Sequence, residues 1–105
     1  MTNMLKYMVV HRDPTIPWSK VEENWGKLAN VESARWVRTC YNKEIGVRYC
    51  IWLAPNEKDL QKVFTDLNIS WESMIEVEET VPDMWGGKWK AHLEAEATAD
   101  TLGAL

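Results

Sequence analysis

The order of the hydrophobic patterns along the chain constrains its fold more than any other feature. Four segments are rich in β-branched and aromatic residues or alternate apolar with polar positions, and two repeat apolar residues at helical spacing. The expected strands are 4–12, 34–41, 47–53 and 74–81, with one helix from Ser19 and another after Asn56. This order is that of a split βαβ unit. We therefore expect an α+β, ferredoxin-like βαββαβ domain with a four-stranded antiparallel sheet.

Local signals mark the helix starts and one turn. Ser19 and Glu22 have the spacing of a capping box, in which two side chains satisfy backbone N–H groups of the first turn. Asn56 is a favourable N-cap for the second helix, whose apolar positions are Leu60, Val63, Phe64 and Leu67. The short segment 42–46 contains a glycine, which predicts a hairpin between the second and third strands.

Alternate residues of the third strand point to opposite faces of the sheet. We expect the more apolar row to meet the helices, namely Val47, Tyr49, Ile51 and Leu53. The open face then carries Arg48, Cys50, Trp52 and Ala54. If the hairpin pairs evenly about residue 44, the open face also carries Trp36, Arg38 and Cys40, whereas a slip of one residue sends these three to the other side.

Length and charge restrict the class of protein. The chain has 105 residues, with 12 basic and 16 acidic side chains and a net charge of −4, which disfavours nucleic-acid binding. No apolar run is long enough for a transmembrane helix, and residues 1–13 lack a secretory signal. We expect a cytoplasmic protein with reduced thiols, consisting of a domain at 1–83 and a partly helical extension at 84–105 that forms a tail or a dimer clasp.

Tryptophan is unusually frequent, with seven residues in the chain. Trp25 falls on the apolar face of the first helix, but the expected faces place Trp52 and Trp36 on the open side of the sheet. A single two-layer core does not require large side chains there. The sequence therefore predicts a second buried surface, either a subunit interface or a ligand cavity.

Three segments resemble a small ferredoxin-like family that includes actinobacterial nickel-responsive proteins. They are 7–13 (YMVVHRD), 36–39 (WVRT) and 49–57 (YCIWLAPNE), within a similarity that covers about residues 4–82. The resemblance implies a homodimer in which the open sheet faces of two ferredoxin-like units pack together, forming a dimeric α/β barrel. In some members it also implies a bound nickel ion.

The candidate metal ligands are His11, Cys40 and Cys50, because thiolate and imidazole suit nickel, copper or zinc. The chain has no Cys-x-x-Cys or His-x-x-x-His spacing, so a site would need donors from separate strands or from two subunits. The structural alternative is that the cysteines are small buried apolar residues and that His11 anchors a loop.

A second group of side chains could bind an aromatic or acidic small molecule. Trp and Arg together supply flat apolar area and a planar donor for carboxylates, and the group comprises Trp36, Arg38, Arg48, Tyr49 and Trp52. The alternative is that the Trp residues form a dimer interface while the Arg side chains pair with Glu76 or Glu78.

Three functions remain open. The first is a small homodimeric metal-binding or metal-responsive protein, with nickel as the cofactor to consider. The second is a ligand-binding dimeric α/β barrel, such as a cofactor-independent oxygenase, and the third is a structural interaction module. No catalytic residue is identified, because the sequence has no phosphate-binding glycine loop and no nucleophile elbow. The third strand also lacks the aromatic motif of an RNA-recognition fold.

Overall fold

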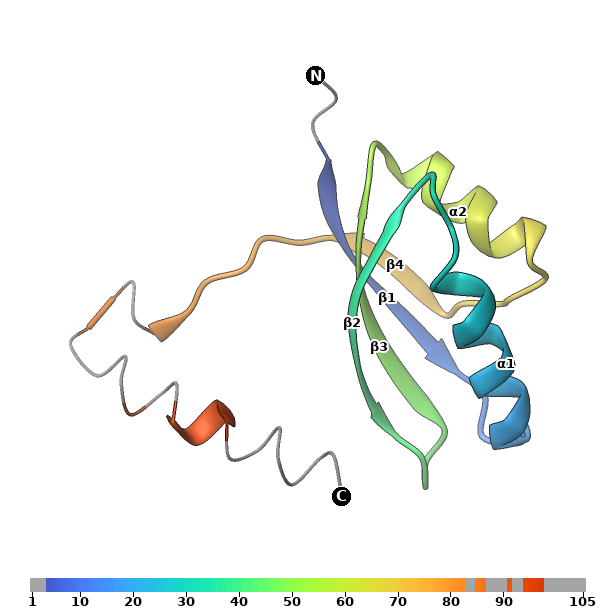
Figure 1. Ribbon diagram of the computed structural model, residues 1–105, viewed down its shortest axis with the longest axis horizontal. Coiled ribbons are helices and arrows are strands. Elements are labelled where there is room, and N and C mark those ends of the chain that lie inside the picture. Colours follow the sequence, from blue (N-terminus) through green and yellow to red (C-terminus); the bar gives the residue numbers. More distant parts are fainter. Residues whose placement is uncertain (1–3, 83–84, 87–90, 92–93, 98–105) are drawn as a thin grey trace.

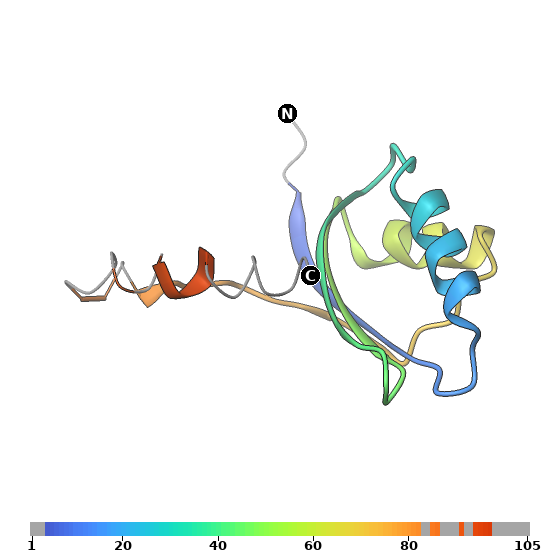
Figure 2. The ribbon, with the colours of Figure 1, turned by 60° about the horizontal axis from the view of Figure 1, so that its bottom comes forward.

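The computed structural model describes residues 4–82, 85–86, 91 and 94–97, and it shows a sheet covered on one face by two helices (Figure 1). The elements are β1 (Leu5–Arg12), α1 (Trp18–Leu28), β2 (Arg35–Asn42), β3 (Val47–Ala54), α2 (Glu57–Asp66) and β4 (Ser73–Glu76). The four strands lie in the order β2-β3-β1-β4 and all neighbours are antiparallel. The α+β class and the four-stranded antiparallel sheet are confirmed. Figure 2 shows α1 and α2 on the same side of the sheet.

The two helices begin in different ways. Asn56 caps α2 as predicted, since its side-chain oxygen accepts a hydrogen bond of 2.8 Å from the backbone N–H of Asp59. The capping box predicted for α1 is wrong. That helix begins at Trp18, with Pro17 in the N-cap position and no side-chain cap. The Pro17 carbonyl instead accepts from the backbone N–H groups of Lys20 and Val21, so Ser19 lies within the first turn.

The hairpin between β2 and β3 forms as predicted. The side-chain oxygen of Asn42 accepts from the backbone N–H groups of Glu44 and Ile45. Gly46 has a φ of +70°, and a Cβ atom there would lie 2.6 Å from the Cα of Pro14. This position therefore requires glycine both for its backbone conformation and for the close approach of the loop after β1.

A bulge at Val37 changes which residues of β2 share a face. Trp36 pairs with Trp52, but the next pair is Arg38 with Ile51, so the register shifts between Trp36 and Arg38. Paired residues of neighbouring strands point to the same side. Trp36 consequently faces the helices, whereas Arg38 and Cys40 face the open side, and the even pairing that would have kept all three together is not present.

The predicted faces of β3 are wrong. The row that meets the helices is Arg48, Cys50, Trp52 and Ala54, all of which are buried. Of the row expected there, Val47 alone is buried, while Tyr49, Ile51 and Leu53 are exposed or partly exposed. The guanidinium of Arg48 can be buried because the carboxylate of Asp13 pairs with it and offsets its charge. The sequence prediction chose the row with more apolar residues. This criterion does not identify the buried row here, because both rows of the strand contain large apolar side chains.

Aromatic side chains fill the layer between the sheet and the helices. Trp52 is fully buried, stacks on Trp36 with 6.4 Å between ring centroids, and meets Phe64 of α2 edge-on at 5.4 Å. Trp25 of α1 continues the series, 6.1 Å from Trp36. The prediction that Trp52 and Trp36 lie on the open face is therefore wrong. These side chains span the space between the sheet and helices, which explains part of the tryptophan excess.

The last strand is shorter than predicted. β4 ends at Glu76 rather than at residue 81, although the backbone N–H of Val77 still donates to the carbonyl of Lys6. Most of the predicted extension at 84–105 lies outside the described residues. Of its described residues, 94–97 are helical and Trp85 is exposed. None of the described helices has the length and apolar character that crossing a membrane requires.

Candidate functional site: a buried polar pocket on the helix face

A small cavity lies between the sheet and α1 and is lined by polar side chains. Its volume is about 10 Å³, close to the minimum that holds one water molecule. The polar and sulfur-bearing lining residues are His11 from β1, Arg48 and Cys50 from β3, and Asn24 from α1. Apolar side chains, including Val21 and Ile69, complete the wall. The cavity therefore brings an imidazole, a guanidinium, an amide and a thiol together in the interior.

His11 is buried in a defined tautomer. Its side chain is 2% exposed, and Nδ1 lies 2.7 Å from the backbone oxygen of Ser70. A carbonyl oxygen can only accept, so Nδ1 carries the proton and Nε2 of the neutral ring carries the lone pair. Nε2 has no hydrogen-bond partner in the described structure. Burial lowers the pKa of His11, with a smaller contribution from the charge of Arg48.

Arg48 is the positively charged residue of the pocket, and one of its two terminal nitrogens has a hydrogen-bond partner. Its Nη2 donates to the carboxylate of Asp13 over 3.2 Å, and only 5% of its side chain is exposed. Its other terminal nitrogen, Nη1, is buried without a partner in the described structure. Arg48 is also the cross-strand neighbour of His11. The pocket thus contains an unpartnered donor on Arg48 and an unpartnered acceptor on His11.

Cys50 contributes a thiol that is buried and hydrogen-bonded. The hydroxyl of Thr39 donates to Sγ over 3.1 Å, and the indole N–H of Trp36 donates to the same hydroxyl over 2.7 Å. Burial raises the pKa of the Cys50 thiol, although the Thr39 hydrogen bond and the charge of Arg48 act in the opposite direction. The thiol is therefore protonated at neutral pH in the absence of a ligand.

The structure brings together only part of each residue set predicted from the sequence. His11 and Cys50 line one pocket, whereas Cys40 is exposed on the opposite face of the sheet beside Tyr49. Within the described part of the chain, no group of three or more His, Cys, Asp or Glu side chains is arranged to hold a metal ion. The predicted ligand-binding set is also divided, with Trp36, Arg48 and Trp52 facing the helices and Arg38 and Tyr49 facing the open side.

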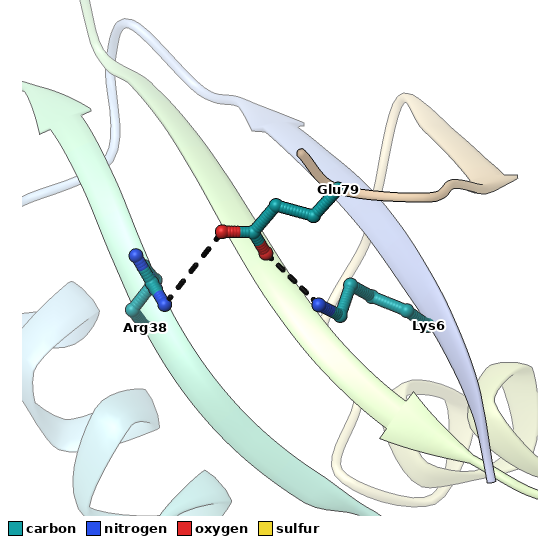
Figure 3. Close-up of polar contacts among 3 residues, drawn as sticks. All are labelled: Lys6, Arg38 and Glu79. Carbon is teal, nitrogen blue, oxygen red and sulfur yellow. Dashed lines mark hydrogen bonds and ion pairs between the residues drawn. The ribbon is translucent and has the colours of Figure 1, made fainter. Parts of the chain in front are cut away.

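Both arginines have carboxylate partners other than the predicted Glu76 and Glu78. Arg48 pairs with Asp13, and Arg38 lies 4.0 Å from Glu79, which also contacts Lys6 (Figure 3). The reason is that β4 ends early, so the segment after it crosses the open face and brings Glu79 above the sheet.

Two residues of the site were not identified from the sequence: Asp13, which pairs with Arg48, and Asn24, which lines the pocket. Asp13 directly follows β1, where it was interpreted as part of a turn, and Asn24 lies in the first helix between Val21 and Leu28. Asn24 is buried together with these apolar neighbours. A polar residue on the buried side of an amphipathic helix is the signal that could have indicated it.

Comparison with known proteins agrees with the fold. The family model described as nickel responsive protein SCO4226-like matches residues 7–77. The crystal structure of SCO4226 from Streptomyces coelicolor A3(2) is similar, with a TM-score of 0.62, 19% sequence identity, and coverage of 72% of this chain and 99% of that chain. No curated protein matches this chain. At 19% identity the structural likeness concerns the fold alone, whereas the family match spans more than half of the sequence. The chain therefore belongs to the SCO4226-like nickel responsive protein family.

Proposed function

We propose that the protein is a homodimeric metal-responsive protein and that His11 and Cys50 are ligands of a divalent transition-metal ion. The observation that supports this most directly is the buried, unpartnered Nε2 of His11, a residue that lines the same small cavity as Cys50. The family's description makes nickel the first ion to test.

The two side chains have the donor chemistry that such an ion requires. The N–H of the ring nitrogen that does not bind the metal commonly donates a hydrogen bond to a backbone carbonyl oxygen, as Nδ1–H of His11 does to the oxygen of Ser70. Imidazole and thiolate both suit nickel. The fit is partial, because square-planar or tetragonal nickel sites take further ligands and no third His, Cys, Asp or Glu joins this pair among the described residues.

Charge in the pocket sets the conditions for binding. The guanidinium of Arg48 opposes a second cation, but its pairing with Asp13 offsets that charge. His11 is neutral at neutral pH because burial lowers its pKa, so its lone pair needs no deprotonation. Cys50 must lose its proton to act as a ligand, and binding should therefore release protons. When bound, the ion supplies a positive charge that replaces the thiol proton.

Calorimetric titration of the untagged, full-length protein with NiCl₂ tests this site. Repeating the titration in buffers of different ionisation enthalpy should show release of about one proton per ion. Cys50→Ser and His11→Gln should each weaken binding by at least about tenfold. Cys40→Ser is the matched control and should leave the affinity unchanged. Equal affinity in all three variants, or no binding by the wild-type protein, would exclude the site, provided that circular dichroism shows folded proteins.

The open face of the sheet supports the homodimer. Apolar side chains occupy this face on all three of β1, β3 and β4, including Met8, Tyr49, Ile51 and Ile75. Tyr49 is 41% exposed and Ile75 is 59% exposed, although both are large. A sheet buries its apolar faces against another layer, and contiguous exposed apolar area is typical of interfaces. We propose that the open face of a second copy supplies that layer.

Light-scattering measurement of the molar mass tests the dimer separately from the metal site. The wild-type protein should have twice the chain mass of 12.2 kDa, and Ile75→Glu should reduce the mass to that of one chain. Ile45→Glu is a suitable control, because Ile45 is 54% exposed but lies in the β2–β3 hairpin turn. A wild-type mass of one chain would refute the dimer, and dissociation by both variants would refute its placement on the open face.

A further inference from the structure

The chain after β4 leaves the domain on the open side of the sheet. Figures 1 and 2 both show residues 77–82 extending away from the strands, opposite to α1 and α2, with residues 94–97 farther out on the same side. The radius of gyration is 15.5 Å, compared with roughly 13 Å for a compact domain of about 100 residues. We call residues 77–82 and 85–86 the arm, because they project from the compact part of the molecule.

The start of the arm is fixed to the sheet by one carboxylate. Oε1 of Glu79 lies 2.9 Å from Nζ of Lys6 on β1, and Oε2 lies 4.0 Å from Nη2 of Arg38 on β2. Figure 3 shows the carboxylate between these two cations, with one oxygen toward each. Lys6 is the second residue of β1, so the arm crosses the sheet near one end and leaves Tyr49, farther along the open face, 41% exposed. The two ion pairs therefore set the direction in which the arm leaves the sheet.

The arm carries a large aromatic side chain in an exposed position. Trp85 is 79% exposed, the largest exposed fraction among the large apolar side chains that the structure describes. Its position is defined, because its backbone N–H donates to the carbonyl of Pro82 and its indole N–H donates to the hydroxyl of Thr80. Burying this ring against a partner would remove a large apolar area from water, which is favourable.

The arm lies outside the region that matches the family model, which ends at residue 77. The domain that the family shares therefore does not account for Trp85. The arm also begins on the face that the proposed homodimer covers, and the ion pairs of Glu79 lie on that face. A partner for Trp85 must consequently be compatible with a second copy packed on the open face.

We propose that the arm clasps a second copy of this chain, and that Trp85 packs against the domain of that copy. The inference rests on the proposed homodimer, in which the open faces of two copies pack together. Packed sheets lie about 10 Å apart, so a copy on the open face would lie beside an arm that extends on that side. Two-fold symmetry makes the contact reciprocal, because each copy contributes one arm and receives the other. The second copy also excludes water from the ion pairs of Glu79, which strengthens the anchor of the arm.

Photo-crosslinking of the purified full-length protein tests the contact directly. The photoreactive residue p-benzoylphenylalanine replaces Trp85, where it keeps a large aromatic group, and the irradiated protein is analysed by denaturing gel electrophoresis. We expect a covalent product of twice the chain mass of 12.2 kDa, and peptide mapping should place the crosslink within residues 4–76 of the other chain. The matched control carries the same residue in place of Ile45, which is 54% exposed in the β2–β3 hairpin turn, and should give little of this product.

Sedimentation velocity over a dilution series measures the contribution of Trp85 to assembly. Trp85→Ser should raise the dissociation constant of the dimer by at least about tenfold, because a buried Trp is a typical interface anchor. Ile45→Ser removes an exposed apolar side chain outside the arm and should leave the constant unchanged. Circular dichroism of each variant shows that it is folded before its assembly is compared.

The outcomes separate the clasp from the dimer. A wild-type protein with the mass of one chain would refute both. A dimer in which position 85 forms no crosslink between chains, or crosslinks only within its own chain, would refute the clasp and leave the dimer intact. The same conclusion follows if Trp85→Ser and the wild-type protein have equal dissociation constants. Equal weakening by Trp85→Ser and Ile45→Ser would show a general loss of apolar surface and would also overturn the clasp.

Discussion

The two faces of the sheet differ in how they hold charge. The helix face buries Arg48 and His11 in a small pocket, with Asp13 as the partner of the arginine. The open face holds Lys6 and Arg38 in partly exposed pairs with one carboxylate. Burial makes the loss of one partner costly on the first face, whereas solvent limits that cost on the second. The comparison shows that charged residues alone do not distinguish the solvent side of this sheet from its core side.

The largest expected difference between the faces concerns two positions of β3 that lie on opposite sides of the sheet. Trp52→Ala should lower the free energy of unfolding by about 3–5 kcal/mol, because it leaves a cavity among Trp36, Phe64 and the helices. Tyr49→Ala, on the open face, should cost less than about 1 kcal/mol in dilute solution, where subunit contacts contribute least. Denaturant unfolding monitored by circular dichroism measures both. A larger cost for Tyr49→Ala would reverse the assignment of the faces.

An intermediate effect is expected for the buried ion pair. Asp13→Asn leaves Arg48 inside the pocket without its carboxylate and should cost about 2 kcal/mol of stability. Arg48→Met removes the buried charge itself and should cost less, since the partly exposed Asp13 can be solvated. The double variant separates the pair from the individual side chains. A greater cost for Arg48→Met than for Asp13→Asn would contradict this description of the pocket.

A smaller effect is expected from the protonation of His11. Burial lowers its pKa below the usual 6.5, so between the folded and unfolded pKa values the unfolded chain binds more protons. The stability due to neutral His11 is therefore complete above about pH 6.5 and is lost as the pH falls below it. Nearby Arg48 adds to the shift, whereas Asp13 and the Ser70 hydrogen bond oppose it.

Unfolding free energies measured between about pH 5.5 and 8 test this effect above the range in which most carboxylates titrate. The wild-type protein should lose stability toward the acidic end, and His11→Gln should show a flatter profile. A wild-type profile that is flat, or that rises toward low pH, would show that His11 is not held neutral in the folded protein.

Element order could be predicted from the sequence because it depends on local patterns. The period of apolar residues and the Asn56 cap identified α2, and the segment ending at Gly46 identified the hairpin. The start of α1 was missed by one residue, because Pro17 supplied the first acceptor in place of a side chain. These features require only residues that are close in sequence.

The faces of β3 and most of the pocket could not be predicted, because they depend on distant residues. Burial of Arg48 requires Asp13, which is 35 positions earlier in the chain. The orientation of Arg38 requires a bulge at Val37 that no local signal indicated. His11 and Cys50 were identified as candidates by their chemistry, but only the fold shows that they share a cavity and that Cys40 lies on the other face.

The central claim is that the row of β3 formed by Arg48, Cys50 and Trp52 faces the helices and that the adjacent strand β2 presents Cys40 on the opposite, open face. Thiol labelling of the native protein with 5,5′-dithiobis(2-nitrobenzoic acid), in dilute solution where subunit contacts contribute least, tests this directly, because in the single chain Cys40 is exposed and Cys50 is 2% exposed. The account predicts that one thiol per chain reacts rapidly, that Cys40→Ser abolishes this reaction, and that Cys50→Ser leaves it unchanged. Rapid labelling of Cys50 in the folded Cys40→Ser variant would contradict the account.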